Sequence, residues 1–389
     1  MATTRPMGAE LMRRFLAAAL LTSALTVPAL AQQGTLKVVS IDVEGGGGTL
    51  FVTPEGKSLL IDTGWPSGAG LLSSPDGAKN SADRIAAAAK KLGLSKIDYL
   101  IITHYHMDHV GGAMELVKRI PVDTFIDHGP NAEHLKPGEQ IPPDLAGGMP
   151  DQLYPRYLEI IKGHKHIVAK PGQVIQIGSM TDTIVSSDGV TMSKPLPGAG
   201  QPIAACNTAE STSEKADGGE ENTRSVASML TFRKVKIAMF GDLSWKKERE
   251  LSCPVGKLGH VNLLIVTQHG SNISSNPASI ADMHPDVALM GMSGKKGGDE
   301  DPIKLIKASP GLMGFWQTHE SFAHPAWGAS DKNMVANLNP PAGAVAEHAK
   351  QMFTVPPDEG HAIHAEITAD GKITMTNDRN GFSKTYQVK

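Results

Sequence analysis

Three histidines and an aspartate fall within six consecutive positions of the chain, as His104, His106, Asp108 and His109. They directly follow the apolar run 97–102, which we predict to be a buried strand. Imidazole and carboxylate groups together suit zinc, manganese or iron. Because sites in layered α/β folds lie in loops at the carboxyl ends of strands, this cluster predicts a metal centre.

Two later strand ends carry side chains of the same kinds. Asp242 follows the apolar run 236–240, and His269 follows the run 262–266. An aspartate placed between two metals can bridge them, and a histidine can complete the ligands of the second metal. Each signal is weak alone, but we expect both side chains to meet the histidine cluster.

The motifs H-x-H-x-D-H, G-D and H-G, in this order, resemble the metallo-β-lactamase superfamily. The closer resemblance is to the metallo-hydrolase domain of the competence DNA-uptake protein ComEC. Five segments are similar to that group's motifs: 40–46, 59–64, 222–225, 240–243 and 268–271. The resemblance implies a four-layer αββα sandwich, in which two mixed β-sheets pack together with helices outside.

The resemblance also implies a site that holds one or two divalent ions, with zinc expected first and manganese as the alternative. Asp108 would both bind metal and orient the attacking water, and Asp62 would support the site through hydrogen bonds. The implied ligands are His104, His106, Asp108, His109, Asp242 and His269.

Two positions depart from the family's pattern. Asn222 stands where classical zinc β-lactamases have a third histidine, and Gln268 opens the motif that begins with histidine in the ComEC group. We therefore expect a weaker first metal site, or one completed by another group. The histidines considered for that role are His128, His164, His166 and His319. Ser271, beside His269, either contacts substrate or only forms a turn.

The length of 389 residues, with 41 glycines and 26 prolines, allows a large domain with insertions. We expect the hydrolase-like domain over 36–297, with an insertion at about 129–221, and an extension over 298–389 packed on the same domain. Helices are predicted over 81–92, where Ser81 is the N-cap, and over 109–119, 152–162 and 245–251. The polar stretch 195–221 is predicted to be a mobile loop.

The amino terminus reads as a signal peptide over 1–31. Arg13 and Arg14 precede the apolar run 15–27, and Ala29-Leu30-Ala31 forms a cleavage signal before Gln32. We predict export to a bacterial periplasm or to the medium, with no membrane-spanning segment left after cleavage. Cys206 and Cys253 could pair in such an oxidising compartment, or could remain thiols.

The predicted reaction is hydrolysis by a metal-activated water, because no convincing G-x-S-x-G or Cys-His nucleophile motif is present. The ComEC resemblance favours phosphodiesters. A net charge of −3 argues against a nucleic-acid substrate. Only local groups of basic residues favour one. The alternatives are a β-lactam, lactone or other ester substrate, and a non-catalytic metal- or ligand-binding protein with the same fold.

Overall fold

The computed structural model describes residues 1–2, 34–67, 80–138, 141, 147–329, 331–343 and 359–388. The predicted signal segment 1–31 lies outside these residues, apart from its first two positions. The strands are β1 (Leu36–Ser40), β2 (Thr49–Val52), β3 (Ser58–Ile61), β4 (Ile97–Ile101), β5 (Val122–Asp127), β6 (Lys165–Val168), β7 (Val174–Ile177), β8 (Met180–Ser187), β9 (Val190–Thr191), β10 (Ala227–Phe232), β11 (Val235–Met239), β12 (Leu263–Ile265), β13 (Val287–Met290), β14 (Gly314–His319), β15 (Val335–Asn337), β16 (Ile363–Ile367), β17 (Lys372–Asn377) and β18 (Ser383–Gln387).

The helices alternate with these strands along most of the chain. They are α1 (Ser81–Lys91), α2 (Met107–Val110), α3 (Ala113–Leu116), α4 (Pro150–Ile161), α5 (Glu220–Arg224), α6 (Trp245–Ser252), α7 (Pro277–Met283) and α8 (Glu300–Lys307), with the 3₁₀ turns η1 (Ala204–Asn207), η2 (Thr267–Gly270) and η3 (Lys332–Met334).

The strands form two mixed sheets. In the first, the order is β18-β17-β16-β1-β2-β3-β4-β5-β6, and in the second it is β15-β14-β13-β12-β11-β10-β8-β7, with β9 paired to β8. The pairs from β3 to β6 are parallel, as are those from β11 to β15. Each sheet therefore has a run of parallel strands whose carboxyl ends can carry a site.

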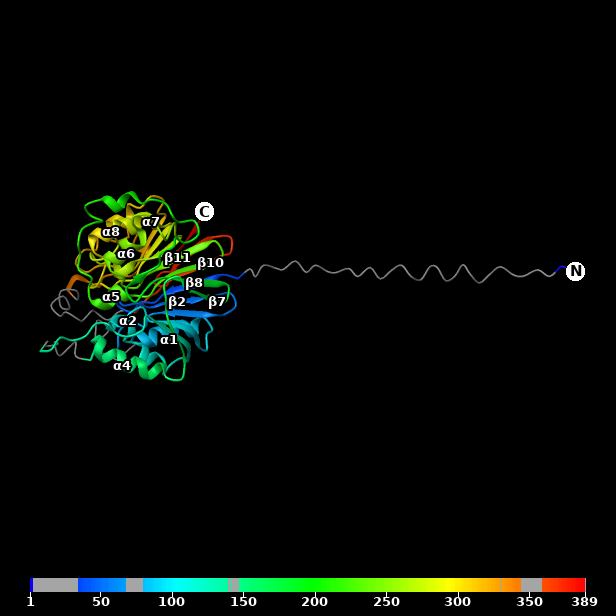
Figure 1. Ribbon diagram of the computed structural model, residues 1–389, viewed down its shortest axis with the longest axis horizontal. Coiled ribbons are helices and arrows are strands. Elements are labelled where there is room, and N and C mark those ends of the chain that lie inside the picture. The colour runs from blue at the N-terminus through cyan, green and yellow to red at the C-terminus, as the bar shows by residue number, and fades with distance from the viewer. Residues whose placement is uncertain are drawn as a thin grey trace. The chain divides into compact units, whose positions relative to one another are not determined.

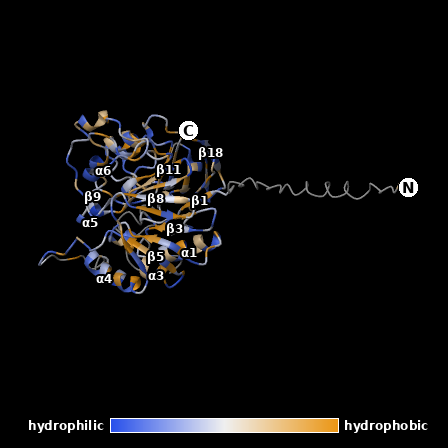
Figure 2. Cartoon of the chain, turned by 45° about the vertical axis from the view of Figure 1, so that its right-hand side comes forward, coloured by the Kyte–Doolittle hydropathy of each residue, from blue (hydrophilic) through white to orange (hydrophobic). Residues whose placement is uncertain are grey.

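Three apolar clusters hold the layers together. One lies between the sheets and joins Leu59 and Ile101 of the first to Ile237 and Leu263 of the second. Another packs α1, α3 and α4 on the first sheet, and a third packs α6, α7 and α8 on the second. The helices accordingly cover the two outer faces (Figure 1), and the strands between them are largely apolar (Figure 2). The predicted αββα sandwich is confirmed.

The helix predicted over 109–119 is instead two short helices, α2 and α3. The break falls at Gly111 and Gly112, which pack against the loop after β3: a Cβ on Gly112 would lie 2.1 Å from the carbonyl oxygen of Thr63. In addition, α1 is capped by Asn80, whose side chain accepts a hydrogen bond from the Asp83 amide at 2.9 Å. The predicted cap, Ser81, is buried and binds the Trp65 amide with its hydroxyl.

The polar stretch 195–221 is tied to the second sheet's helical layer. Cys206 in η1 forms a disulfide with Cys253, at the end of α6, with Cα atoms 5.6 Å apart. Pro202 forms an isolated bridge with Val255. Of the two states that the sequence left open for these cysteines, the structure therefore shows the disulfide. Within the described ranges, no helix has the length and apolar character needed to cross a membrane.

Asp182 of β8 is a fully buried carboxyl group whose Oδ2 accepts a hydrogen bond from the Ser228 hydroxyl at 3.0 Å. Burial raises its pKa from 3.8 to about 7. Between these values the folded chain binds more protons than the unfolded chain, so the free energy of unfolding falls as pH rises. Above about pH 7 this contribution is fully lost.

We expect Asp182→Asn to stabilise the protein at pH 8 by at least ~1 kcal/mol, since a neutral side chain carries no cost of burying charge. The variant should also lose part of the decline in stability between pH 5 and pH 8. Urea unfolding at both pH values measures this, with the exposed Asp301→Asn as the control. Equal pH dependence in Asp182→Asn and wild type would contradict the prediction.

Candidate metal centre

The candidate site lies where parallel strands of both sheets end. His104 and His106 occupy the loop after β4, and Asp108 and His109 begin α2. From the second sheet, Asp242 follows β11, and His269 lies in η2 after β12. His269 and its neighbour Gln268 adopt left-handed backbone conformations, with φ of 56° and 49°, which turn the chain sharply at this point.

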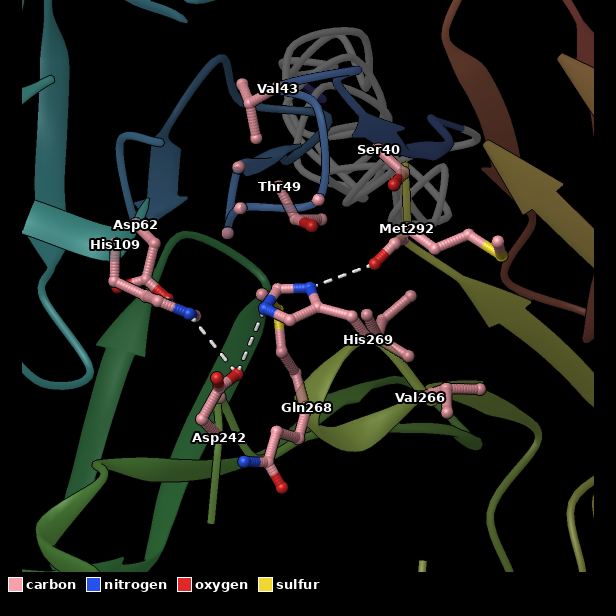
Figure 3. A pocket seen from close by; sticks show the side chains of 18 of the residues that line it. Ser40, Val43, Thr49, Asp62, His109, Asp242, Val266, Gln268, His269 and Met292 are labelled. Carbon is pink, nitrogen blue, oxygen red and sulfur yellow. Dashed lines mark hydrogen bonds and ion pairs between the residues drawn. The ribbon is translucent and has the colours of Figure 1, made fainter. Parts of the chain in front are cut away.

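Four of these side chains converge on one point. One ligand atom from each of them lies within 4.8 Å of all the others. His109 Nε2 lies 3.1 Å from Asp108 Oδ2. It also lies 3.2 Å from Asp242 Oδ1, and His269 Nε2 lies 3.3 Å from the same Asp242 oxygen (Figure 3). Asp108, His109, Asp242 and His269 are all buried, with at most 6% of each residue exposed.

Three of the converging atoms have no hydrogen-bond partner among the described residues: His109 Nε2, His269 Nε2 and Asp242 Oδ1. A buried polar atom without a partner is costly, so these atoms need something at their common point. Nitrogen and carboxylate oxygen donors are those of zinc or manganese sites. The residues present therefore fit a divalent cation.

The electrostatics of this point also favour positive charge. Burial alone would lower the pKa of His109, but the carboxylates of Asp242, Asp108 and Asp62 outweigh burial and raise that pKa well above its ordinary value. Burial opposes the charged form of Asp242, yet His109 and His269 hold its pKa well below the usual range. The carboxylates thus remain charged and draw a cation.

Hydrogen bonds to the far nitrogens fix the orientation of both rings. His109 Nδ1 lies 2.8 Å from Asp62 Oδ2, and His269 Nδ1 lies 3.0 Å from the Gly291 carbonyl oxygen. Each ring therefore presents Nε2 to the centre, as in metal sites whose histidines are held by a carboxylate or carbonyl. The chain can approach this closely because residue 47 is glycine: a Cβ there would lie 2.8 Å from His109 Nδ1.

Asp62 also organises the histidine loop. Its Oδ1 accepts a hydrogen bond from the Thr103 amide and its Oδ2 one from the Thr103 hydroxyl, both at 2.8 Å. Because that hydroxyl donates to Asp62, it accepts from His104 Nδ1, 3.0 Å away, which leaves His104 Nε2 with its lone pair. These contacts fit the supporting role predicted for Asp62.

His106 and His104 form a separate pair of possible metal-binding nitrogens. Its Nε2 lies 3.1 Å from the Glu133 carboxylate, so Nε2 carries the proton and Nδ1 does not. His106 Nδ1 lies 3.0 Å from His104 Nε2. Burial, together with His109 and His106, holds the pKa of His104 well below its usual value. His104 Nε2 and His106 Nδ1 thus each offer a lone pair, and the two nitrogens are close enough to bind one cation together. This pair could hold a second cation.

Asn222, the position at which the resemblance implied a third histidine, lies in α5. Its amide nitrogen donates to the Asp217 carbonyl oxygen at 3.1 Å, and its buried Oδ1 has no partner among the described residues. A Cβ on Gly218 would lie 2.5 Å from the Asn222 amide nitrogen, and one on Gly219 would lie 2.9 Å from His106 Nε2. These glycines thus bring α5 close to the histidine pair.

Two histidines considered from the sequence as extra ligands are outside the group of four converging side chains and have carboxylate partners of their own. His128 Nε2 contacts Glu221 at 2.9 Å. His319 Nε2 contacts Asp42 at 2.9 Å and joins it and Glu44 in a separate buried group. Each ring thus contacts a carboxylate that is distant in the sequence, so the pairing could not be inferred from the sequence.

The Asp42 group contains a cation of its own, Arg84. Asp42 accepts hydrogen bonds from Arg84 Nη1 at 2.7 Å and from the Glu44 amide at 2.9 Å, in addition to its contact with His319. Burial opposes its charge, but His319 and Arg84 lower its pKa to about 2. This cluster therefore fastens the loop after β1.

The remaining predicted positions have local partners. His166 Nε2 contacts Asp127 at 2.8 Å, and the His164 ring packs on Phe125. The Ser271 amide donates to the Gln268 carbonyl oxygen at 2.9 Å, which fits the turn interpretation; its contact with substrate stays a prediction.

Two residues that contact the site, Glu133 and Lys296, were not predicted from the sequence as site residues. Glu133 lies in the insertion, where no motif marks it. Lys296 follows β13, and its ammonium contacts Asp108 Oδ2. β13 is the parallel neighbour of β12, so the place of Lys296 after a strand end is the sequence signal that could have identified it.

The family comparison agrees with this geometry. Residues 44–189 match the family model of the metallo-beta-lactamase superfamily. The chain has a metallo-β-lactamase fold. The resemblance predicted from the motifs is therefore confirmed at the level of the superfamily, whereas the closer resemblance to ComEC stays a prediction. No curated protein matches the sequence of this metallo-β-lactamase-fold chain.

Solved structures that are similar to the chain share little sequence with it. The metallo-beta-lactamase fold protein YhfI from Bacillus subtilis is 16% identical over 72% of this chain and 95% of its own, with a TM-score of 0.38. Tm1679, a metal-dependent hydrolase of the beta-lactamase superfamily, is 12% identical over 72% and 95%, with a TM-score of 0.37. A metallo-beta-lactamase mutant from Cronobacter sakazakii is 17% identical over 52% and 60%, with a TM-score of 0.31.

Asp62→Ala should weaken zinc binding by roughly 10- to 100-fold, because it removes the contacts that hold His109 and, through Thr103, His104. Competition titration with a chelating dye measures the affinity. Asp98→Ala is the matched control, since Asp98 also joins β3 to β4 through Ser58 but lies at their other end. Equal zinc affinity of Asp62→Ala and wild type would exclude the supporting role.

Proposed function

We propose that this chain is a metal-dependent hydrolase that acts on phosphodiesters with an activated water. The observation that carries the proposal is the convergence of Asp108, His109, Asp242 and His269, whose ligand atoms lie within 4.8 Å of one another. The superfamily match over residues 44–189 supports hydrolysis. The motif resemblance to ComEC favours the phosphodiester.

In this proposal each side chain has a stated task. Asp242 offers one oxygen to the point that His109 and His269 share, and Asp108 would orient the water through a hydrogen bond. Asp62, the Gly291 carbonyl and Glu133 keep the imidazole protons on the nitrogens that face away from the centre. When bound, a pair of divalent cations would supply the activation of water and the polarisation of the bond to be cleaved.

A substrate panel tests the proposal. The full chain, loaded with zinc or with manganese, is assayed on bis(p-nitrophenyl) phosphate, on nitrocefin and on p-nitrophenyl acetate. Metal-dependent cleavage of the phosphodiester, lost with chelator, is the expected result. Preferred cleavage of nitrocefin or the ester would select the alternative substrates, and metal binding without any turnover would select the non-catalytic protein.

Export is also a proposal. It is supported by the signal-like sequence 1–31 and by the disulfide between Cys206 and Cys253, because disulfides persist in oxidising compartments. Expression in a Gram-negative host followed by amino-terminal sequencing tests it. A periplasmic form that begins at Gln32 is expected, and a cytoplasmic form that retains residues 1–31 would contradict it.

A further inference from the structure

Lys296 is held at the mouth of the metal centre by the turn after β13. Its amide donates to the Ser293 hydroxyl at 2.9 Å, and its carbonyl oxygen accepts from the Ser293 amide at 3.0 Å. The next residue, Gly297, lies against His269: a Cβ there would lie 2.2 Å from the His269 carbonyl oxygen. The backbone of this lysine is therefore fixed relative to a candidate ligand.

The side chain of Lys296 lies between a carboxylate and an aromatic ring. Its ammonium contacts Asp108 Oδ2 and lies 5.3 Å from the centre of the Trp65 ring. The Trp65 indole is buried and donates to the Glu44 carbonyl oxygen at 3.1 Å, so its position is fixed. About a third of the Lys296 side chain, 32%, is exposed, so this side chain is partly accessible from solvent.

Asp108 Oδ2 is shared by Lys296 with the two rings of the centre. It lies 3.1 Å from His109 Nε2 and 3.4 Å from His269 Nε2. If these side chains held a cation, Asp108 Oδ2 would be one of its ligands, and the Lys296 ammonium would be repelled because both are positive. The flexible four-carbon chain of Lys296 would then let its ammonium pair with another anion nearby.

We propose that Lys296 binds a phosphate oxygen of the substrate, beside the metal centre and against Trp65. This inference rests on the proposed function and deepens it, since it assigns the recognition of the anionic group to one residue. A lysine ammonium is a compact point charge that suits a phosphate oxygen. Together with the cations it makes the mouth of the site positive, which favours an anionic ester over a neutral one.

The test compares Lys296→Met with Lys295→Met, which removes the same charge from the neighbouring position of the same turn. Each zinc-loaded full-length protein is titrated calorimetrically with inorganic phosphate and assayed on bis(p-nitrophenyl) phosphate and on the uncharged p-nitrophenyl acetate. Zinc content is measured in parallel.

In Lys296→Met we expect phosphate affinity to fall at least tenfold and KM for the phosphodiester to rise by a similar factor. Zinc content should be unchanged, and cleavage of the neutral ester should fall by a smaller factor than cleavage of the phosphodiester. Lys296→Arg should restore phosphate binding, and Lys295→Met should behave as wild type.

Unchanged phosphate affinity in Lys296→Met would overturn the inference, as would a loss of zinc, which would make the lysine a support for Asp108. Failure of wild type to bind phosphate would overturn it too. If wild type binds phosphate through Lys296 but cleaves no phosphodiester, the proposed function fails while the binding role of Lys296 stands.

Discussion

Replacing Asp242 with alanine should abolish metal-dependent hydrolysis while the fold remains. Asp242 Oδ1 lies 3.2 Å from His109 Nε2 and 3.3 Å from His269 Nε2, so it is the oxygen that both rings share. Its loss removes one of the two carboxylate charges at the centre. A bound metal ion stabilises the charge of the transition state by several kcal/mol, and Asp242 helps to hold that ion. We therefore expect kcat/KM to fall by about a thousandfold or more.

Steady-state kinetics on the preferred substrate, with circular dichroism as the check on folding, measures this effect. Asp108→Ala should give a loss of the same kind. Asp123→Ala is the control, because Asp123 is an exposed carboxylate near the start of β5 that pairs with Lys96. Near-wild-type activity of either purified variant, Asp108→Ala or Asp242→Ala, would rule out the proposed centre.

A zinc titration of chelator-treated protein should show two unequal sites. Four side chains converge on one point, whereas His104 and His106 form the second with fewer donors. Fewer protein donors hold a cation less tightly, so we expect the zinc at His104 and His106, the site that lacks the third histidine, to bind at least about tenfold more weakly than the zinc at the four converging side chains. The site of four side chains should fill before activity reaches its maximum.

Asn222→His tests the cause of this difference. An imidazole at this position, close to His106, should tighten the weaker site and leave the stronger one unchanged. Asn262→His, a substitution between β11 and β12 away from the site, is the control. Two zinc ions of equal affinity in wild type, or no change at the weaker site in Asn222→His, would contradict the assignment.

The fold and the centre of the site were accessible from the sequence for one physical reason. Parallel strands end at a common edge, so polar side chains after three apolar runs could be expected to meet. The partners of single histidines were not accessible. His128 binds Glu221 and His319 binds Asp42, which are 93 and 277 positions away. A histidine's neighbours are set by tertiary packing, and the histidine itself carries no sign of them.

Local backbone detail was also beyond the sequence pattern. The apolar spacing of 109–119 is that of one helix, yet Gly111 and Gly112 let the loop after β3 approach and divide it. Lys296 and Glu133 gain their roles only from contacts with Asp108 and His106, because a lysine or glutamate in a loop is ordinarily solvated.

The place of the carboxyl-terminal strands governs when the protein can acquire its structure. β16 pairs with β1 at every residue from Leu36 to Ser40, and β17 and β18 follow at that side of the sheet. Until residues 363–367 have been synthesised, β1 lacks its hydrogen-bonding partner on that side. Truncations that remove these strands should therefore expose the edge of β1 and make the shortened chain prone to aggregation.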